Sequence, residues 1–392
     1  MSQFSIPYGR QHITDADIAA VTEALRSDYL TTGPRVDEFE GRFADYIGVK
    51  YAVAVANGTA ALHLCALALE VRPGTRVITT PITFAASANC IRYCGGEVWF
   101  ADIDPQTLTL DLEKVRELIE SRPAGFFHGI IPVDFAGYPV NLEAFRALAD
   151  RHGLWIVEDA CHAPGGWFTD SQGVAQHCGN GAYADLAIFS FHPVKHIASG
   201  EGGMITTNDE ALYERLKVLR THGITRDRGN LRYPDHGGWY MEMQQLGYNY
   251  RIPDILCALG ISQLSRADEG LERRQVIARR YDAAFGGAAS AGAMNIHGVP
   301  GEDVLHAFHL YVIEVTRRRE LYDYLRERGI YAQVHYIPVH TMPYYQDIGY
   351  EDADLSRSEA YYAGALSLPM YPSLTDEEQE YVIQAVLQFI DG

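Results

Sequence analysis

The stretch YAVAVANGTAALHLCALAL, residues 51–69, decides the fold class. It begins as a short apolar run typical of a buried strand and passes through the small-residue turn Asn57-Gly58-Thr59. It then continues as a long apolar run that fits a buried helix. A strand that leads through a tight turn into a helix is the first half of a βαβ unit, so the segment predicts an α/β protein.

Strands and helices continue to alternate after this segment. Apolar strands are predicted at 76–81, 97–104, 128–137, 154–160, 184–193 and 202–208, and helices at 84–95, 111–121 and 142–153. Two amphipathic helices, 15–26 and 37–47, come before it, and Thr14 can cap the first. Strands that are apolar on both faces and alternate with helices indicate a mainly parallel central sheet flanked by helices.

The pattern changes after Asn249. A long helix is predicted over 253–286, followed by strands at 306–315 and 331–339 and helices at 321–329 and 375–390. Because 392 residues are too many for one ordinary core, we expect a large domain over 1–252 and a smaller α+β domain over 253–392. The polar segment 225–245 is predicted to be an exposed loop.

Charge and composition argue against several classes of protein. The net charge of −19 disfavours nucleic acid and anionic membranes as partners. No segment reaches the roughly 18 uncharged apolar residues of a membrane span. The first residues lack the apolar centre of a signal peptide, so a cytoplasmic location is expected. Cys90 and Cys94 share a helical face, but no matching second pair follows, which predicts core packing.

The side chains with the clearest chemistry follow predicted strands, at the edge where ligands collect in parallel sheets. Lys195 lies between a buried strand and a glycine-rich run, where partial desolvation lowers the amine pKa and makes the amine nucleophilic. The alternative is a strand-end lysine that reaches water. Asp159 ends the strand 154–160 and can keep a pyridine nitrogen protonated, or can cap the turn that follows.

A phosphate site is predicted at the turn before the first buried helix. The backbone N–H groups of Gly58, Thr59 and Ala60 open this helix, and its dipole favours an anion. Ser190 can add a hydroxyl donor. Asn249 can donate to a phosphate or begin the long helix of the second half. Each of these residues taken alone is equally typical of an ordinary α/β turn.

Two further residues are candidates for contact with a flat cofactor ring. Phe84 can stack on such a ring, and His162 can hydrogen-bond it or orient Asp159, although each is also a common packing residue. The order along the chain decides between these readings: a phosphate turn, an aromatic residue, an aspartate at a strand end and then Ser-x4-Lys. This is the layout of the aspartate-aminotransferase-like superfamily, so we favour functional roles for Lys195 and Asp159.

Longer motifs extend the similarity over nearly the whole chain. They are IPYGRQHIT, SDYLTTGP, FEGRFADYIGVKYAVAVANGTAALHLCALAL, VEDACHAPGG, FSFHPVKHIASGEGG, LRTHGITR, GYNYRIPDILCALGISQL and LSLPMYPSLTDEE. The sequence closely resembles the DegT/DnrJ/EryC1/StrS family of sugar aminotransferases. Gly58 replaces the serine or alanine common at that position, a change that leaves the backbone donors intact.

The resemblance implies an aspartate-aminotransferase-like fold (pyridoxal-phosphate fold type I) with pyridoxal 5′-phosphate as cofactor. It implies that Lys195 forms the Schiff base and shuttles protons, and that Asp159 pairs with the pyridine nitrogen. It assigns the cofactor phosphate to Thr59, Ala60 and Ser190. It also implies a homodimer with shared active sites, in which Asn249 reaches the phosphate of the neighbouring subunit's cofactor.

The resemblance also implies where the substrate binds. Residues matching the family's nucleotide-sugar pocket are Tyr8, Asp28, Tyr29, Leu30 and Thr31, together with His335 and Tyr336 of the loop 333–336. A metal site is not expected among His306, His309, His335 and His340. On a strand, side chains three positions apart point to opposite faces, which separates His306 from His309.

The SFHPVKHI motif with its GEGG continuation resembles that of the family's 4-aminotransferases. The implied reaction is amino transfer from L-glutamate to C4 of a UDP-linked 4-keto-6-deoxy-N-acetylhexosamine, UDP-2-acetamido-2,6-dideoxy-β-L-arabino-hex-4-ulose, in pseudaminic acid biosynthesis. Keto sugars of the D-gluco series or perosamine type stay open, and so does a pyridoxal-phosphate-dependent sugar dehydratase. Some dehydratases of the family have histidine in place of the lysine, so Lys195 favours amino transfer.

Overall fold

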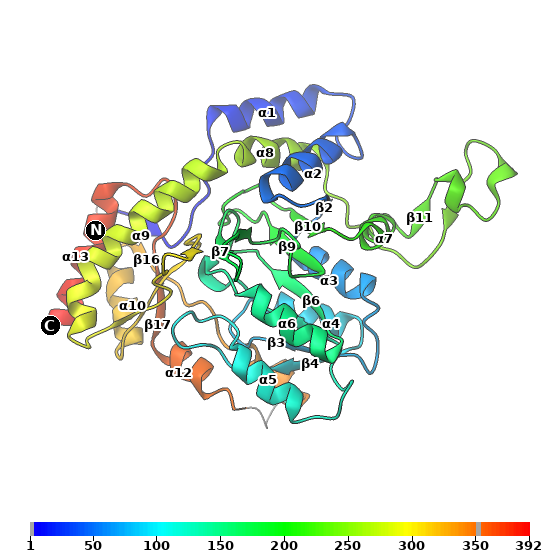
Figure 1. Ribbon diagram of the computed structural model, residues 1–392. Helices are drawn as coiled ribbons and strands as arrows, with labels where there is room; N and C mark the ends of the chain where they lie inside the picture. The colour runs from blue at the N-terminus through cyan, green and yellow to red at the C-terminus, as the bar shows by residue number, and fades with distance from the viewer. Residues whose placement is uncertain (1–3, 350–353) are drawn as a thin grey trace.

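The computed structural model describes residues 4–349 and 354–392 and is built around a seven-stranded sheet (Figure 1). The strand order is β2-β10-β9-β6-β5-β3-β4. The strands are β2 (Tyr51–Val55), β3 (Arg76–Thr79), β4 (Glu97–Phe100), β5 (Gly129–Ile131), β6 (Trp155–Asp159), β9 (Leu186–Ser190) and β10 (Gly203–Thr207). Strand β10 is antiparallel to β2 and β9, and the other neighbouring pairs are parallel. The mainly parallel sheet predicted from the sequence is confirmed.

Helices cover both faces of this sheet, because its strands are apolar on both sides. Helices α3 (Gly58–Ala68), α4 (Ala86–Tyr93) and α7 (Glu210–Arg220) pack against one face. Helices α5 (Leu112–Glu120) and α6 (Leu142–His152), together with α2 (Pro34–Ile47) and α8 (Asp254–Leu264), pack against the other. Alternate residues of β2 show the division, since Val53 packs with α3 whereas Ala54 packs with α2.

Local sequence signals set several helix ends. Helix α1 (Asp15–Arg26) begins at the predicted cap Thr14, which forms a capping box with Asp17. Helix α2 starts with Pro34 and ends at Gly48, whose φ of 79° few other residues adopt. The bounds of α1 and the end of α2 match the predicted helices 15–26 and 37–47, whereas α2 begins earlier than predicted, at Pro34.

The predicted long helix 253–286 is two helices, α8 and α9 (Ala267–Ser290), separated by Ser265 and Arg266. At this break Arg266 turns toward α1 and donates to Asp17 Oδ2 over 2.6 Å. The Ser265 hydroxyl donates to the Ser262 carbonyl over 2.7 Å. The prediction of one helix was wrong because a contact between distant segments interrupts it.

A second hydrophobic core forms beside the sheet, around α9, α10 (Arg318–Glu327) and α13 (Asp376–Asp391). It contains a three-stranded sheet of β13 (Asn295–Ile296), β15 (Tyr311–Glu314) and β17 (Ala365–Leu368). This core fits the α+β character predicted for the second half. The proposed division at residue 252 stays a prediction.

Two predicted strands of this second half are much shorter than expected. Residues 306–310 are irregular, with Phe308 at a φ of 47°, and the strand covers only Tyr311–Glu314. The predicted strand 331–339 is reduced to β16 (Ile330–Tyr331), which pairs in parallel with β1 (Ile6–Pro7). This pairing carries the N-terminal segment, and with it Tyr8, to the second core.

Short elements that the sequence did not indicate complete the fold. Strands β7 (Trp167–Thr169), β8 (Ala175–His177) and β14 (Val304–Leu305) form a small sheet. Helices α11 (Pro343–Asp347) and α12 (Ser356–Gly364) lie in the second half. Cys90 is fully buried in α4, and Cys94 packs against the same core, as predicted.

The segment 225–245 is confirmed as exposed and belongs to an arm that projects from the body at the right of Figure 1. Its two strands, β11 (Ile224–Thr225) and β12 (Glu242–Met243), pair antiparallel. The arm exposes large apolar side chains, with Trp239 at 83% and Leu246 at 74% of their accessible surface.

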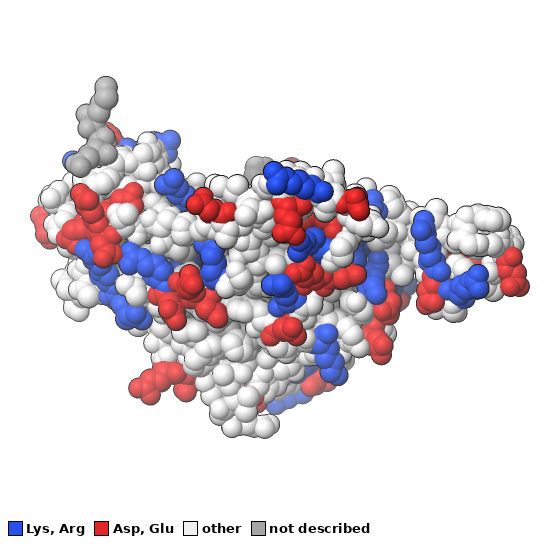
Figure 2. All heavy atoms as spheres, turned by 90° about the horizontal axis from the view of Figure 1, so that it is seen from above, with Lys and Arg blue, Asp and Glu red and all other residues white. Residues whose placement is uncertain are grey.

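Basic and acidic side chains are interspersed on the face shown in Figure 2. Arg35 illustrates this on α2, where it pairs with Glu23 at 2.5 Å and with Glu38 at 2.8 Å. Among the described helices, none combines the length and apolar character needed to cross a membrane.

Candidate active site

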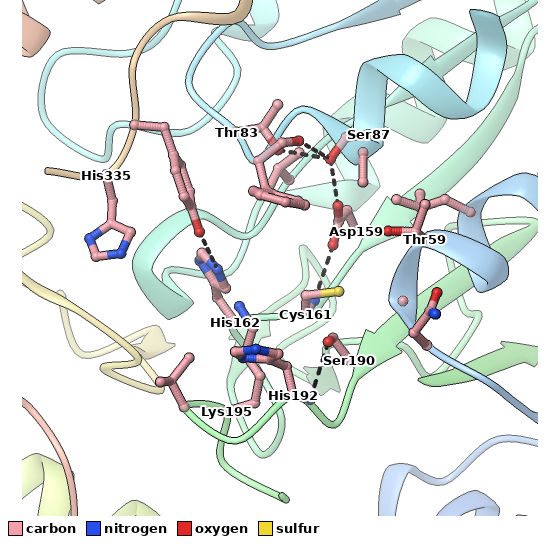
Figure 3. A pocket seen from close by; sticks show the side chains of 18 of the residues that line it. Thr59, Thr83, Ser87, Asp159, Cys161, His162, Ser190, His192, Lys195 and His335 are labelled. Carbon is pink, nitrogen blue, oxygen red and sulfur yellow. Dashed lines mark hydrogen bonds between the residues drawn. The ribbon is translucent and has the colours of Figure 1, made fainter. Parts of the chain in front are cut away.

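A cavity of about 430 Å³ lies at the carboxyl-end edge of the central sheet (Figure 3). It brings together most of the residues selected from the sequence: Tyr8, Gly58, Thr59, Phe84, Asp159, His162, Ser190, Lys195, His335 and Tyr336. Helix α3 begins at this cavity and strands β6 and β9 end there. The parallel topology therefore explains why side chains far apart in the sequence meet.

Lys195 lies in the turn after β9 and directs its amine toward the cavity. Burial lowers the pKa of this amine to about 8. Its Nζ lies 3.3 Å from Nε2 of His309. An amine with a lowered pKa has a larger deprotonated fraction near neutral pH than an ordinary lysine, and the deprotonated amine can attack an aldehyde carbon, which is the property expected from the sequence.

Asp159 is the last residue of β6 and is 5% exposed. Its Oδ2 accepts a hydrogen bond from Ser87 Oγ at 2.7 Å, and its Oδ1 accepts one from the Cys161 amide at 3.2 Å. Ser87 Oγ is also 2.8 Å from Thr83 Oγ1. These contacts hold the carboxylate in one orientation toward the cavity (Figure 3).

Ser87 and Thr83 were not selected from the sequence. A signal was present, because TTPITFAAS places hydroxyl and small residues directly after the strand Arg76–Thr79. Polar residues at that position of a parallel sheet reach the same edge as Asp159.

The N-terminus of α3 forms one wall of the cavity. Asn57 caps the helix, and its side-chain oxygen accepts from the Ala60 amide at 2.8 Å. Gly58 and Thr59 line the cavity, whereas the structure does not place Ala60 among the lining residues. A Cβ on Gly58 would come within 3.1 Å of Ser190 Cβ, so the glycine keeps open the space between α3 and β9. A helix N-terminus beside a serine hydroxyl suits a phosphate group.

His162 and Tyr336 form a polar pair on the opposite wall. His162 Nδ1 accepts from the Ala136 amide at 3.2 Å, and its Nε2 lies 3.2 Å from Tyr336 Oη. Burial holds the His162 pKa well below its usual range. The ring is therefore neutral, with its proton on Nε2, and donates to Tyr336. Phe84 is 63% exposed at the rim of the cavity, and its ring centroid is 6.2 Å from that of Tyr336.

Tyr8 and His335 meet at the side of the cavity next to the second core. Their ring centroids are 4.9 Å apart. The Tyr361 hydroxyl donates to the His335 carbonyl at 2.6 Å, and His335 Nδ1 lies 2.9 Å from Ser367 Oγ. Burial lowers the His335 pKa to about 3, so this side chain is neutral.

Two groups of predicted residues lie away from the cavity of this chain. Residues 28–31 are exposed in the connection between α1 and α2 and do not line it. Asn249 is also exposed and pairs through the backbone with Thr221 at the base of the arm. Within one chain, the structure does not join either group to Lys195.

Comparison with protein families decides the classification. The model of the DegT/DnrJ/EryC1/StrS aminotransferase family matches residues 11–387. The chain belongs to this family. One relative is the spore coat polysaccharide biosynthesis protein SpsC of Bacillus subtilis (strain 168), which is 40% identical over 99% of this chain and 97% of its own length. The UDP-4-amino-4,6-dideoxy-N-acetyl-β-L-altrosamine transaminase of Campylobacter jejuni (serotype O:2) is 34% identical over 98% of both chains.

Solved structures of the family share the fold. The putative sugar aminotransferase Spr1654 of Streptococcus pneumoniae, in its PMP form, has a TM-score of 0.89 at 28% identity, over 98% of this chain and 99% of its own. The PseC aminotransferase of Helicobacter pylori, involved in biosynthesis of pseudoaminic acid, has a TM-score of 0.88 at 29% identity, over 99% and 100%.

This DegT-family chain is therefore an aminotransferase with the pyridoxal-phosphate fold type I, and its cofactor is pyridoxal 5′-phosphate. The cavity fits that cofactor, since its lining includes the amine of Lys195, the buried carboxylate of Asp159, and Gly58 and Thr59 at the N-terminus of α3 beside Ser190.

Proposed function

We propose that the protein transfers an amino group from L-glutamate to C4 of a UDP-linked 4-keto-6-deoxy-N-acetylhexosamine, UDP-2-acetamido-2,6-dideoxy-β-L-arabino-hex-4-ulose, releasing 2-oxoglutarate. The observation that carries this proposal is the position of the Lys195 amine and the Asp159 carboxylate in one cavity that also contains Tyr8 and His335. We place the reaction in pseudaminic acid biosynthesis and the protein in the cytoplasm.

The residues that line the cavity have different roles toward the cofactor. Pyridoxal phosphate supplies an electron-withdrawing ring that lets an amino group leave one carbon and reach another. Asp159 pairs with the ring nitrogen and keeps it protonated, and Ser87 holds the carboxylate in place. Gly58, Thr59 and Ser190 would bind the phosphate, and Phe84 and His162 would contact the ring, since all five residues line the cavity. The amine of Lys195 would hold the cofactor and, when free, would move a proton at the reacting carbon of the amino donor.

The lining residues favour an amino acceptor whose reacting part is an uncharged sugar ring. Among described residues, the cavity lining contains no arginine, so this chain provides no guanidinium fork there for a substrate carboxylate. Tyr8, His335 and Tyr336 provide aromatic surface and polar atoms that suit a sugar ring. The nucleotide and diphosphate then supply binding energy away from the reacting carbon.

We further propose a homodimer whose subunits share their active sites. The exposed arm, with Trp239 and Leu246, presents apolar side chains that a second subunit can cover. Asn249 at the base of the arm is exposed and free to reach a neighbouring cofactor phosphate. Residues 28–31 are likewise exposed and available to a partner's substrate.

A side-by-side assay tests the identity of the substrate. Purified enzyme with pyridoxal phosphate and L-glutamate is given UDP-linked 4-keto-6-deoxy sugars of the L-altro and D-gluco series, and the 4-amino products are measured by mass spectrometry. We expect a higher kcat/KM for the L-altro series. A preference for the D-gluco series would reassign the sugar, and dehydration without gain of nitrogen would replace amino transfer with a dehydratase reaction.

A further inference from the structure

We propose that His309 is a positioning residue for Lys195, which holds the lysine amine through Nε2 at the place where the amine must exchange protons. The proposal rests on the aminotransferase function and adds a residue that the sequence did not suggest. His309 lies 114 positions from Lys195, in the second half of the chain. It contacts the lysine and is not itself among the residues that line the cavity.

The backbone around His309 is fixed in an unusual way. Phe308 has a φ of 47°, a region that a phenylalanine rarely adopts. The buried guanidinium of Arg274 in α9 donates to the Phe308 carbonyl at 3.0 Å and to the His309 carbonyl at 3.3 Å. A third bond from Arg274, to the Met370 carbonyl at 3.1 Å, ties this turn to the second core. These three bonds hold the turn in the conformation that places His309 Nε2 3.3 Å from Lys195 Nζ.

The side chain itself is not explained by packing alone. His309 is 4% exposed, and its Nδ1 is buried without a hydrogen-bond partner among described residues. Leaving a buried polar atom unpaired costs about 1–3 kcal/mol, which an apolar residue of similar size would avoid. Among the described residues, the His309 ring makes one hydrogen-bond contact, which is to Lys195 Nζ. A role at that amine accounts for a histidine here.

The chemical state of His309 suits this role. Burial, followed by the nearby Lys195 charge, keeps the His309 pKa well below its usual range. The ring is neutral, so Nε2 can accept a hydrogen bond from the ammonium form of Lys195, and the proton stays on the lysine. In the other tautomer, Nε2–H can donate to the free amine. One side chain can therefore hold the lysine in both of its protonation states.

Several other titratable groups surround Lys195 and His309 and also influence the pKa values of these two side chains. They are Asp159, Cys161, His162, His196, Arg274 and His335. The ring of His162 is the nearest, with a centroid 4.2 Å from that of His309. Because His162 Nδ1 already accepts from Ala136, it does not replace the contact to Lys195.

The test compares His309→Phe and His309→Leu, which lose the contact, with His309→Gln, which keeps an acceptor and a donor. His63→Gln is the matched control, because His63 is also a buried histidine, but its Nδ1 lies 3.0 Å from Tyr250 Oη and it does not line the cavity. In cofactor-free protein, acetylation of Lys195 is followed against pH by peptide mass spectrometry. In the complete enzyme, kcat and KM are measured.

We expect both apolar variants to lower the pH midpoint of Lys195 acetylation by about one unit, since the ammonium loses its acceptor. We expect kcat to fall about 10- to 100-fold with little change in KM. His309→Gln should restore most of the midpoint and most of kcat, and His63→Gln should leave the midpoint unchanged.

An unchanged midpoint in both apolar variants, or an equal loss of kcat in His63→Gln, would overturn the role of His309. If one apolar variant does not fold, the other variant and His309→Gln still decide the outcome. A shifted midpoint in an enzyme that transfers no amine would refute the proposed function but retain the contact between His309 and Lys195.

Discussion

Ser87 Oγ donates a 2.7 Å hydrogen bond to Asp159 Oδ2, and so links the start of α4 to the carboxylate at the end of β6. A hydrogen bond to a charged group contributes about 1.5–3 kcal/mol. We predict that Ser87→Ala weakens pyridoxal phosphate binding at least about tenfold, because Asp159 loses the donor that orients it. Absorbance titration of cofactor-free protein measures this dissociation constant.

Ser358→Ala is the control for that experiment, because Ser358 is also a buried serine whose hydroxyl bonds an aspartate, Asp102, far from the cavity. It should reduce stability and leave cofactor affinity unchanged. Equal affinities of wild type and Ser87→Ala would show that Asp159 needs no such support.

The buried amine of Lys195 should make the stability of the cofactor-free protein depend on pH. Its pKa is about 8 in the folded protein and about 10.5 when exposed. Below pH 8 the folded protein carries a desolvated charge, and this cost disappears as pH rises from about 8 to about 10.5. We predict that Lys195→Met is about 2–3 kcal/mol more stable than wild type at neutral pH.

Urea unfolding of both proteins across this range checks the prediction. The difference in unfolding free energy between them should shrink as pH rises. A difference that is constant with pH would mean that the amine has an ordinary pKa.

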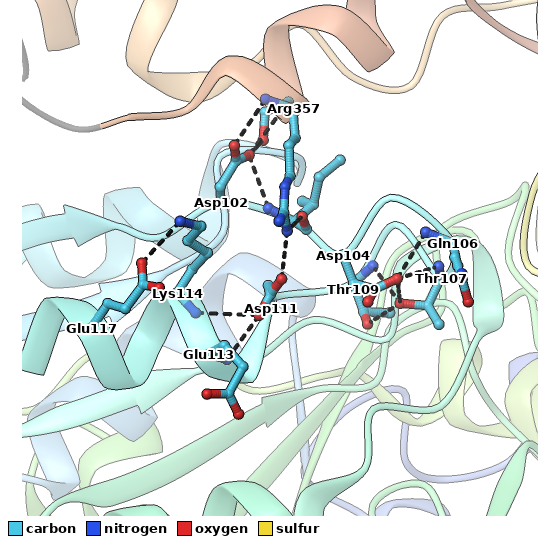
Figure 4. Close-up of polar contacts among 12 residues, drawn as sticks. Asp102, Asp104, Gln106, Thr107, Thr109, Asp111, Glu113, Lys114, Glu117 and Arg357 are labelled. Carbon is cyan, nitrogen blue, oxygen red and sulfur yellow. Dashed lines mark hydrogen bonds and ion pairs between the residues drawn. The ribbon is translucent and has the colours of Figure 1, made fainter.

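Asp102 connects the central sheet to helix α12 (Figure 4). Its carboxylate accepts from the amides of Arg357 and Ser358, each at 2.9 Å, and therefore caps this helix from a distant segment. We predict that Asp102→Ala lowers the unfolding free energy by about 1–2 kcal/mol. It should also raise the KM for the keto sugar, because α12 carries Tyr361, which bonds the His335 carbonyl.

The comparison is with Asp209→Ala, since Asp209 caps α7 through the Leu212 amide at 2.9 Å and does not line the cavity. Thermal unfolding should show a loss of stability in both variants. Steady-state kinetics should show a raised KM only in Asp102→Ala, and an unchanged KM there would separate α12 from substrate binding.

Tyr361 should affect substrate binding through a single hydrogen bond. Its hydroxyl donates to the His335 carbonyl at 2.6 Å. We predict that Tyr361→Phe raises the KM for the nucleotide sugar about five- to tenfold, equivalent to a hydrogen bond of about 1 kcal/mol, with cofactor affinity unchanged.

Tyr281→Phe is a suitable control, because Tyr281 is a buried tyrosine whose hydroxyl donates to the Pro369 carbonyl at 3.0 Å. The KM of Tyr281→Phe for the nucleotide sugar should equal that of wild type. A rise in KM of the same size in both variants would indicate a general loosening of the second core.

The sequence predicted the central sheet well, because its strands are apolar on both faces, and two of them, β6 and β9, end at the polar residues Asp159 and Ser190. Lys195 and Asp159 could be placed from that pattern. The contact between His309 and Lys195 could not be predicted from the sequence, because it depends on the left-handed backbone of Phe308 and on Arg274 from helix α9. Both are tertiary effects that leave no periodic signal.

The same reason explains the errors in the second half. Strands of two residues, such as Ile330–Tyr331, are too short to show alternation, and the break between α8 and α9 coincides with the contact of Arg266 to Asp17. The substrate role of residues 28–31 and the role of Asn249 at a neighbouring subunit's cofactor could be proposed only from family resemblance, because in one chain these residues lie away from the cavity.

The most direct measurement of the central claim follows nitrogen from donor to acceptor. Enzyme with pyridoxal phosphate is incubated with nitrogen-15-labelled L-glutamate and UDP-2-acetamido-2,6-dideoxy-β-L-arabino-hex-4-ulose, and the product is examined by mass spectrometry and NMR. We predict labelled nitrogen at C4 and formation of 2-oxoglutarate with wild type, and neither product with Lys195→Ala. Product without the label, or full turnover by Lys195→Ala, would contradict the account.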